Sequence, residues 1–279
     1  MMTSDAAQTP APAAHQDLVG VLVILIKPSS DQDKQRYDQL QQLRRQHDQA
    51  FSRWLPHITL IPPFTLAGPS NTKDSSPALA DLVNIHEAKL SQIAEAARKV
   101  CKRHETHSLL IDQVSTFPLR KYTNIHLRPF PTNFKDKATK AHQQAVIDGS
   151  ISPVQDADHS SRRIVGLQTD LADAVAPLLR PSANWASQSE RSTKTDEKEK
   201  PSRKNGNVFK PHVSVGQSTS SKATWQLCRS AEKVLSGDDK TGGQRHGLLC
   251  DIDSVQLMIK QKGQEGPYHI HKELPLSQP

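Results

Sequence analysis

The hydrophobic positions of this chain predict two similar series of helices and strands. The run at 19–27 is almost continuously aliphatic, which is typical of a strand buried on both faces. Apolar residues then recur at helical spacing and afterwards in alternation, as in half-buried strands. The first series is a strand, a helix, a strand, a helix and a strand pair, expected at 19–27, 30–49, 57–64, 78–104, 108–117 and 122–128.

The second series repeats this order from the first helix onward. Apolar residues at helical spacing predict helices at 166–180 and 222–236, which flank a short strand at 211–217. A strand pair at 250–260 and 268–274 follows. A repeated order of elements is the signature of a duplicated structural unit. The sequence therefore predicts an α+β fold of two pseudo-symmetric lobes, each with an antiparallel sheet and helices, around a central cleft.

The remaining segments lack apolar periodicity and predict solvated regions. Only 35% of the residues are hydrophobic and 4% are aromatic, which is low for a chain that packs along its whole length. Residues 1–17 predict a disordered tail, and residues 18–279 a single bilobal domain. Flexible inserts are expected at 132–163 and in the Ser/Lys/Glu-rich tract at 181–207.

The candidate chemistry lies in two predicted strands that contain nearly the same tetrapeptide. HITL at 57–60 and HVSV at 212–215 each follow a proline and place a histidine and a hydroxyl residue two positions apart. Alternate side chains of a strand lie on one face, so histidine and hydroxyl share a face in both copies. Two such strands would line the cleft with two imidazoles and two hydroxyls, a set that favours acid/base chemistry on phosphate esters without a metal.

These paired motifs and the doubled order of elements resemble the two-histidine (2H) phosphoesterase superfamily, in its 2′-5′ RNA ligase-like and cyclic nucleotide phosphodiesterase branch. The resemblance implies that His57 and His212 are the catalytic acid/base pair, and that Thr59 and Ser214 bind phosphate oxygens. It also implies that water opens a 2′,3′-cyclic phosphate while one histidine accepts a proton and the other protonates the leaving ribose oxygen. Many bacterial members carry an arginine shortly after the second motif, where this chain has Gln217.

Three further residues are candidates for substrate contacts. Lys210 lies two positions before His212, so strand alternation places its ammonium on the same face, where it would contact a phosphate. The alternative is a surface lysine at the entrance of the strand. Tyr268 and Phe117 are candidates for stacking on a base, because an aromatic face accepts any base. The alternative for both rings is a place in the hydrophobic core.

Charge, cysteine content and the length of apolar runs indicate which binding partners and which cellular compartment to expect. The formal net charge is +7, which favours anionic partners such as nucleotides or RNA. Three cysteines without paired spacing argue against a disulfide framework or a zinc site. The longest apolar run is too short to cross a bilayer, and no secretory signal is visible. We expect a monomer in the cytoplasm or nucleus, with no cofactor, no metal and no membrane partner.

The leading hypothesis is a metal-independent phosphodiesterase that opens 2′,3′-cyclic phosphates of nucleotides or RNA ends by two-histidine acid/base catalysis. An RNA-end processing exonuclease or a 2′-5′ RNA ligase of the same fold is the alternative enzyme, and its mark would be dependence on polymer length. A non-catalytic nucleotide- or RNA-binding protein is a different class. The paired histidines count against it, because binding alone needs no proton transfer. The sequence leaves open which histidine is the base.

Overall fold

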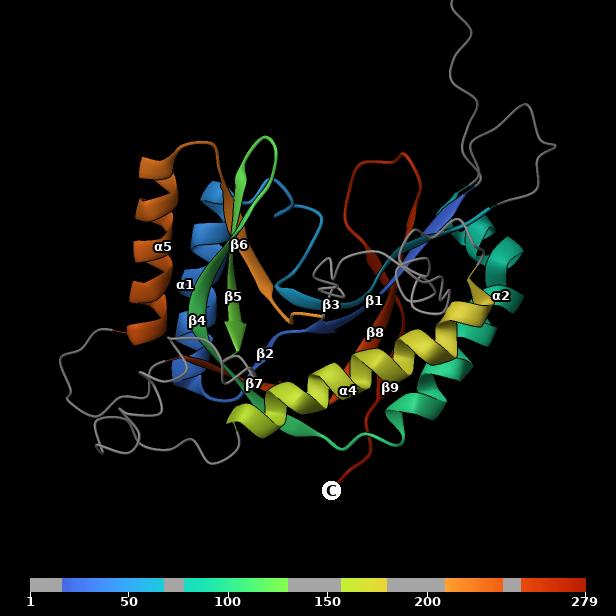
Figure 1. Ribbon diagram of the computed structural model, residues 1–279. Coiled ribbons are helices and arrows are strands. Elements are labelled where there is room, and N and C mark those ends of the chain that lie inside the picture. Colours follow the sequence, from blue (N-terminus) through green and yellow to red (C-terminus); the bar gives the residue numbers. More distant parts are fainter. Residues whose placement is uncertain (1–16, 68–77, 130–156, 180–208, 238–246) are drawn as a thin grey trace, which may run out of the picture.

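The computed structural model describes residues 17–67, 78–129, 157–179, 209–237 and 247–279. Within these ranges it has two antiparallel sheets covered by helices, an α+β fold (Figure 1). In chain order the elements are β1 (Leu18–Leu25), β2 (Lys27–Pro28), α1 (Asp31–His47), β3 (His57–Leu66), α2 (Leu79–Cys101), β4 (His107–Pro118), β5 (Thr123–Pro129), α4 (Ala157–Val175), the 3-10 turn η1 (Ala176–Leu178), β6 (Val213–Ser218), α5 (Ser221–Ser236), β7 (Leu248–Ile252), β8 (Ser254–Gln261) and β9 (His269–Pro275).

The four-stranded sheet has the strand order β3-β1-β8-β9, and all neighbouring strands are antiparallel. As its continuous aliphatic sequence predicts, β1 is an inner strand, and Leu18, Leu22 and Ile24 on it are buried. The helices α2 and α4 pack against this sheet (Figure 1). The first histidine motif opens β3, which is an edge strand.

The five-stranded sheet has the order β2-β7-β4-β5-β6 and is covered by α1 and α5 (Figure 1). The second histidine motif begins one residue before β6, which is also an edge strand. The edge strands β3 and β6 contact each other where the two sheets meet. The topology therefore brings the two motifs to one junction between the lobes.

Each sheet combines strands from both halves of the chain. The first motif strand, β3, shares a sheet with β8 and β9 from the C-terminal end, whereas β6 shares a sheet with β4 and β5 from the first half. One continuous hydrophobic core includes residues of both sheets and of α1, α2, α4 and α5. The predicted α+β fold with two antiparallel sheets is confirmed, but neither sheet is built from one half of the sequence alone.

The predicted strand at 250–260 is wrong in one respect, because it is two strands in different sheets. The chain leaves the five-stranded sheet after β7 and enters the four-stranded sheet at β8, and Asp253 lies at the crossing. The Lys27 ammonium lies 2.8 Å from the Asp253 carboxylate, beside the point where the chain makes the reverse crossing from β1 to β2. Apolar residues recur on both sides of Asp253, with Ile252 before it and Val255 and Leu257 after it, so the sequence reads as one strand.

The helix α4 begins at Ala157, nine residues before the predicted start, so the last part of the insert expected at 132–163 is helical. The rest of that insert, the tract at 181–207 and the tail up to residue 16 lie outside the described residues. Their predicted flexibility remains a prediction.

The helix α1 begins where the sequence predicts, with Ser30 as its N-cap. The Ser30 hydroxyl accepts a hydrogen bond from the Asp33 amide, at 3.2 Å, and so caps the helix. The Asp33 carboxylate in turn accepts the amide of Leu249 on β7, at 2.9 Å. The cap thus fixes α1 on the five-stranded sheet, and the C-terminal end of the same helix leads directly to the first motif.

Candidate active site

The first motif has the alternation expected of a half-buried strand. Ile58 and Leu60 point into the core, while His57 and Thr59 lie on the other face and remain partly exposed. The Nδ1 atom of His57 lies 2.8 Å from the carbonyl oxygen of Leu55. When Nδ1 donates its hydrogen to this carbonyl, Nε2 of the neutral ring is the nitrogen that can accept a proton.

The second motif repeats this geometry. Val213 and Val215 are buried, Ser214 is partly exposed, and Nδ1 of His212 lies 2.8 Å from the carbonyl oxygen of Lys210. Both motif histidines are therefore oriented by the backbone two residues earlier, and both rings have Nε2 available for chemistry when neutral. Lys210, predicted to contact phosphate, orients His212 through its backbone, and its side chain is exposed.

A cavity of about 180 Å³ lies between the two motif strands. His57 lines it from the four-stranded sheet, and Ser214 lines it from the five-stranded sheet. The other lining residues are Arg44, Asp48, Ala50, Trp54, Pro56 and Gln217. The structure thus brings together His57 of the first motif and Ser214 of the second, whereas His212, Thr59 and Lys210 are not among the described residues that line this cavity.

A stack of rings covers His57. Trp54 stacks on His57 with ring centroids 4.5 Å apart, and on Tyr268 with centroids 3.8 Å apart. Tyr268, a predicted base-stacking residue, therefore lies near the first motif and packs against protein. Burial lowers the pKa of His57 below its ordinary value, and the positive charges of Arg44 and His212 lower it further. The ring is consequently neutral at neutral pH and able to accept a proton.

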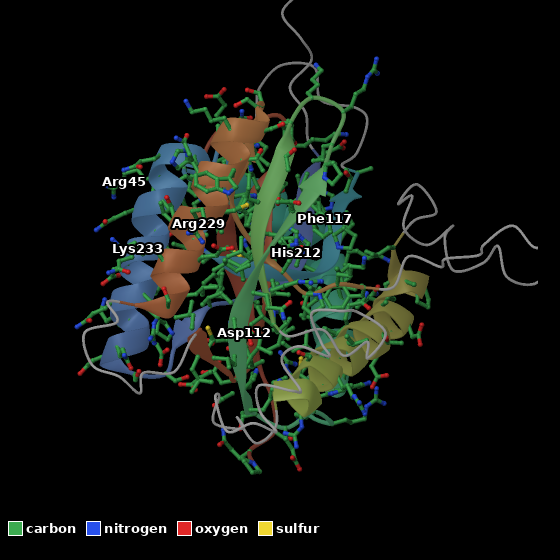
Figure 2. All side chains as sticks on the ribbon, turned by 60° about the vertical axis from the view of Figure 1, so that its left-hand side comes forward. Arg45, Asp112, Phe117, His212, Arg229 and Lys233 are labelled. Atoms are coloured by element: carbon green, nitrogen blue, oxygen red, sulfur yellow. The ribbon has the colours of Figure 1, made fainter. Side chains whose placement is uncertain are left out.

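His212 lies beside two other rings. Phe117 and His126 both contact it edge-on, with centroids 5.2 Å and 5.1 Å away, and they stack on each other at 4.0 Å. Figure 2 shows Phe117 and His212 close together on the five-stranded sheet. Phe117, the other predicted base-stacking residue, therefore lies near the second motif, with its ring packed against His126 and His212.

His126 is a buried histidine that faces the site. It is 1% exposed and lies directly across from Ser214 in the pairing of β5 with β6. Burial lowers the pKa of His126 to about 4, and the positive charges of His212 and Arg128 contribute. The His126 ring beside His212 is therefore uncharged at neutral pH.

Sequence reasoning did not identify Trp54 or Arg44 as site residues and did not commit to His126. Trp54 and Arg44 belong to the end of α1 and the turn after it, outside the repeated motif, so motif symmetry does not point to them. His126 depends on the pairing of β5 with β6, which joins residues far apart in the sequence. The available signals were a tryptophan three positions before His57 and a histidine in a short predicted strand.

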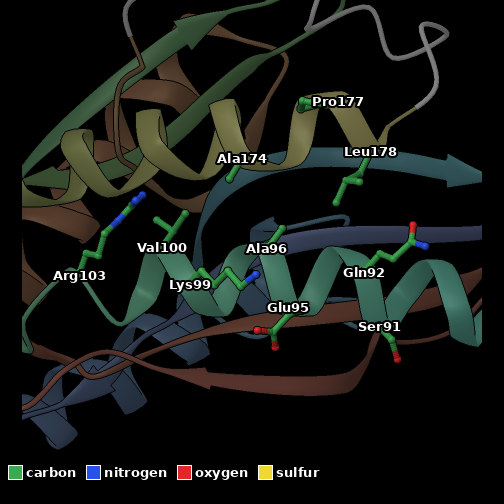
Figure 3. Close-up of a pocket in the computed structure, with 10 residues that line it drawn as sticks. All are labelled: Ser91, Gln92, Glu95, Ala96, Lys99, Val100, Arg103, Ala174, Pro177 and Leu178. Atoms are coloured by element: carbon green, nitrogen blue, oxygen red, sulfur yellow. The ribbon is translucent and has the colours of Figure 1, made fainter.

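A larger cavity, of about 690 Å³, lies between α2 and the α4–η1 segment (Figure 3). Its lining residues come from these elements and, for Arg103, from just after α2, and they include no member of either motif: Ser91, Gln92, Glu95, Ala96, Lys99, Val100, Arg103, Ala174, Pro177 and Leu178. It is therefore separate from the candidate active site.

Within the described ranges, no group of three or more His, Cys, Asp or Glu side chains is placed to hold a metal ion. None of the helices described is long and apolar enough to cross a membrane.

The two antiparallel sheets bring residues of both histidine motifs to one cavity. This is the arrangement expected of a two-histidine phosphoesterase. The family model described as the 2′-5′ RNA ligase superfamily matches residues 29–264, and the chain belongs to this family. The superfamily contains phosphoesterases and RNA ligase-like proteins.

Solved structures with similar folds include LigT of E. coli and Usb1 of Kluyveromyces marxianus. LigT complexed with ATP is 12% identical, with a TM-score of 0.42, and the match covers 94% of this chain and 99% of that chain. Usb1 with uridine monophosphate is 11% identical, with a TM-score of 0.38, and the match covers 92% of this chain and 98% of that chain. No curated protein is significantly similar in sequence.

Proposed function

We propose that the protein is a metal-independent phosphodiesterase that hydrolyses 2′,3′-cyclic phosphates of nucleotides or RNA ends. In the proposed reaction a water oxygen attacks phosphorus while Nε2 of one motif histidine takes its proton. The bond between phosphorus and one ribose oxygen breaks, and the other histidine protonates that oxygen. The product is a ribose monophosphate with one free hydroxyl. Thr59 and Ser214 hold the phosphoryl oxygens, and Lys210 is an additional candidate for phosphate binding.

The observation that carries this proposal is the matching orientation of the two histidines. Each Nδ1 lies 2.8 Å from the carbonyl oxygen two residues earlier, which leaves each Nε2 for proton transfer. His57 and Ser214 line the same cavity from different sheets. A site used only for binding would not require two histidines oriented in this way.

The environment of His57 supports its assignment as the base in the hydrolytic direction. Its lowered pKa keeps the ring neutral near pH 7, which is the state that accepts a proton from water. His212 is then the acid. It lies beside His126, with ring centroids 5.1 Å apart, and the lowered pKa of His126, about 4, keeps that neighbouring ring uncharged near pH 7.

The direct test is an assay of the full chain with the four 2′,3′-cyclic mononucleotides and with an oligonucleotide that ends in a cyclic phosphate. We expect turnover of the mononucleotides, detected as ribose monophosphate by ³¹P NMR, and the same rate in the presence of a chelator. The double variant His57→Ala/His212→Ala is the control for contaminating activity. A folded wild-type protein that opens none of these substrates would overturn the proposal, and turnover of the oligonucleotide alone would favour the RNA-end alternative.

A further inference from the structure

Gln217 lies on the cavity face of β6, although simple alternation from His212 and Ser214 places it on the opposite face. The pairing with β5 shows why it does not. His126 lies across from Ser214, but Ile125 lies across from Gly216 and Asn124 from Gln217, so one residue of β6 is extra. This bulge shifts the phase of the strand. Ser214 and Gln217 therefore both line the cavity.

The Gln217 amide forms two hydrogen bonds with the turn that follows α1. Its Oε1 accepts the backbone N–H of Gln49 at 2.9 Å, and its Nε2 donates to Oδ1 of Asp48 at 3.2 Å. Donor and acceptor are thus both used on a single turn. Because Gln217 belongs to the second motif strand and the turn leads into the first, these two bonds connect the two motifs.

The connection continues from Asp48 to the ring stack over His57. Oδ2 of Asp48 accepts two hydrogen bonds from Arg44, at 3.1 Å from Nε and 2.9 Å from Nη2. Both side chains are almost fully buried, at 2% and 1% exposure. Arg44 also donates from Nη2 to the carbonyl oxygen of Trp54 at 2.9 Å. Trp54 carries the ring that stacks on His57.

The opposite face of β6 contacts the same end of α1. A Cβ atom on Gly216 would lie only 2.7 Å from Cβ of His47 and 2.8 Å from its carbonyl oxygen. The absence of a side chain at 216 lets the end of α1 approach the strand closely. Gly216 thus makes room for the helix end on one face, while Gln217 binds the turn from the other.

We propose that Gln217 is a positioning residue that sets the place of His57 relative to the second motif through Asp48, Arg44 and Trp54. The inference deepens the proposed phosphodiesterase function and depends on it for its effect on catalysis. Its structural part, the attachment of the turn to β6, stands independently. Gln217 lies where many bacterial family members have an arginine, and in this chain its amide binds protein instead.

The experiment compares Gln217→Met with the wild-type protein. Methionine keeps the length and volume of the side chain but removes both hydrogen bonds. The matched control is Gln226→Met, the same change at an exposed position of α5. Amide hydrogen exchange is measured at Gln49 and through the turn to Trp54, together with kcat and KM for a 2′,3′-cyclic mononucleotide well below the melting temperature of each variant.

We expect Gln217→Met to speed exchange at Gln49 and to lower kcat by about tenfold or more, because a displacement of about 1 Å can reduce catalysis by up to about 100-fold. KM should change much less than kcat. Unchanged exchange in the turn, or a wild-type kcat in an active enzyme, would overturn the proposal. If the wild-type protein lacks turnover, the proposed function fails and exchange at Gln49 alone decides whether Gln217 holds the turn.

Discussion

His57 and His212 each place Nδ1 2.8 Å from the carbonyl oxygen two residues earlier, yet their rings have different neighbours. Trp54 stacks face-on over His57, whereas Phe117 and His126 contact His212 through its edge. The backbone geometry is repeated by the motif, and the surroundings come from elements outside it. A duplicated motif thus gives two histidines the same backbone orientation, while the surroundings give their rings different environments, and in the proposed reaction this difference separates the base from the acid.

The largest expected effect comes from removing either histidine. His57→Ala and His212→Ala should each lower kcat by about 10² to 10⁴-fold, because a positioned acid or base contributes that much. The losses in the double variant should be far from additive, since both groups act in one step. The measurement is steady-state turnover of a cyclic mononucleotide, with circular dichroism as a control for folding. Full activity in either folded single variant would remove the pair from the mechanism.

His126 gives the second test, through stability in acid. Its folded-state pKa of about 4 lies below the unfolded value near 6.5, so the unfolded chain binds the extra proton between these pH values. Stability from this site is fully present above pH 6.5 and is lost as the pH falls. His126→Phe keeps an aromatic ring, and between pH 7 and pH 4.5 it should lose about 2 to 3 kcal/mol less than the wild type. Urea unfolding at both pH values measures the difference, and equal losses would contradict a buried neutral histidine beside His212.

The motif hydroxyls test how far the pseudo-symmetry extends. Ser214→Ala should cost about 1.5 to 3 kcal/mol of transition-state stabilisation, the range for a hydrogen bond to a charged group. Thr59→Val should cost less, because Ser214 lines the cavity shared with His57 and Thr59 does not. The ratio of kcat/KM between each variant and the wild type gives these energies. A larger loss for Thr59→Val would place the phosphate on the side of the first motif.

The smallest expected effect is that of Trp54→Ala, which should shift the pH dependence of kcat/KM. Trp54→Ala exposes the His57 ring, and since burial is the main cause of its lowered pKa, that pKa should rise towards 6.5. Protonated His57 cannot act as the base, so the acid limb of kcat/KM should move to higher pH. Phe117→Ala is the matched control on the other side and should leave the acid limb in place. A shift in Phe117→Ala alone would exchange the roles of the two histidines.

The sequence predicts the local elements of this fold well and their long-range pairing poorly. The buried strand expected from residue 19, the Ser30 cap and the alternation around His57 follow from short-range patterns, and the structure has them, although β1 ends at Leu25 and Lys27 already belongs to the other sheet. The change of sheet at Asp253 and the bulge before Gln217 depend on which strands pair, and no local pattern encodes that. For the same reason the sequence identifies both motif histidines as candidates but not the neighbours that distinguish them.

The exchange of strands between the two halves of the chain also determines when the protein can fold during synthesis. The amide of Leu25 on β1 donates to the side chain of Gln256 on β8, a contact that spans 231 positions. Loops of this length close slowly, and domains rich in such contacts are slow folders. Neither sheet is complete until the ribosome has made the C-terminal strands. Until then β1 lacks its partner β8 and β4 lacks its partner β7, so one edge of each strand stays unpaired. A chain interrupted before β7 therefore has both histidines but cannot complete either sheet.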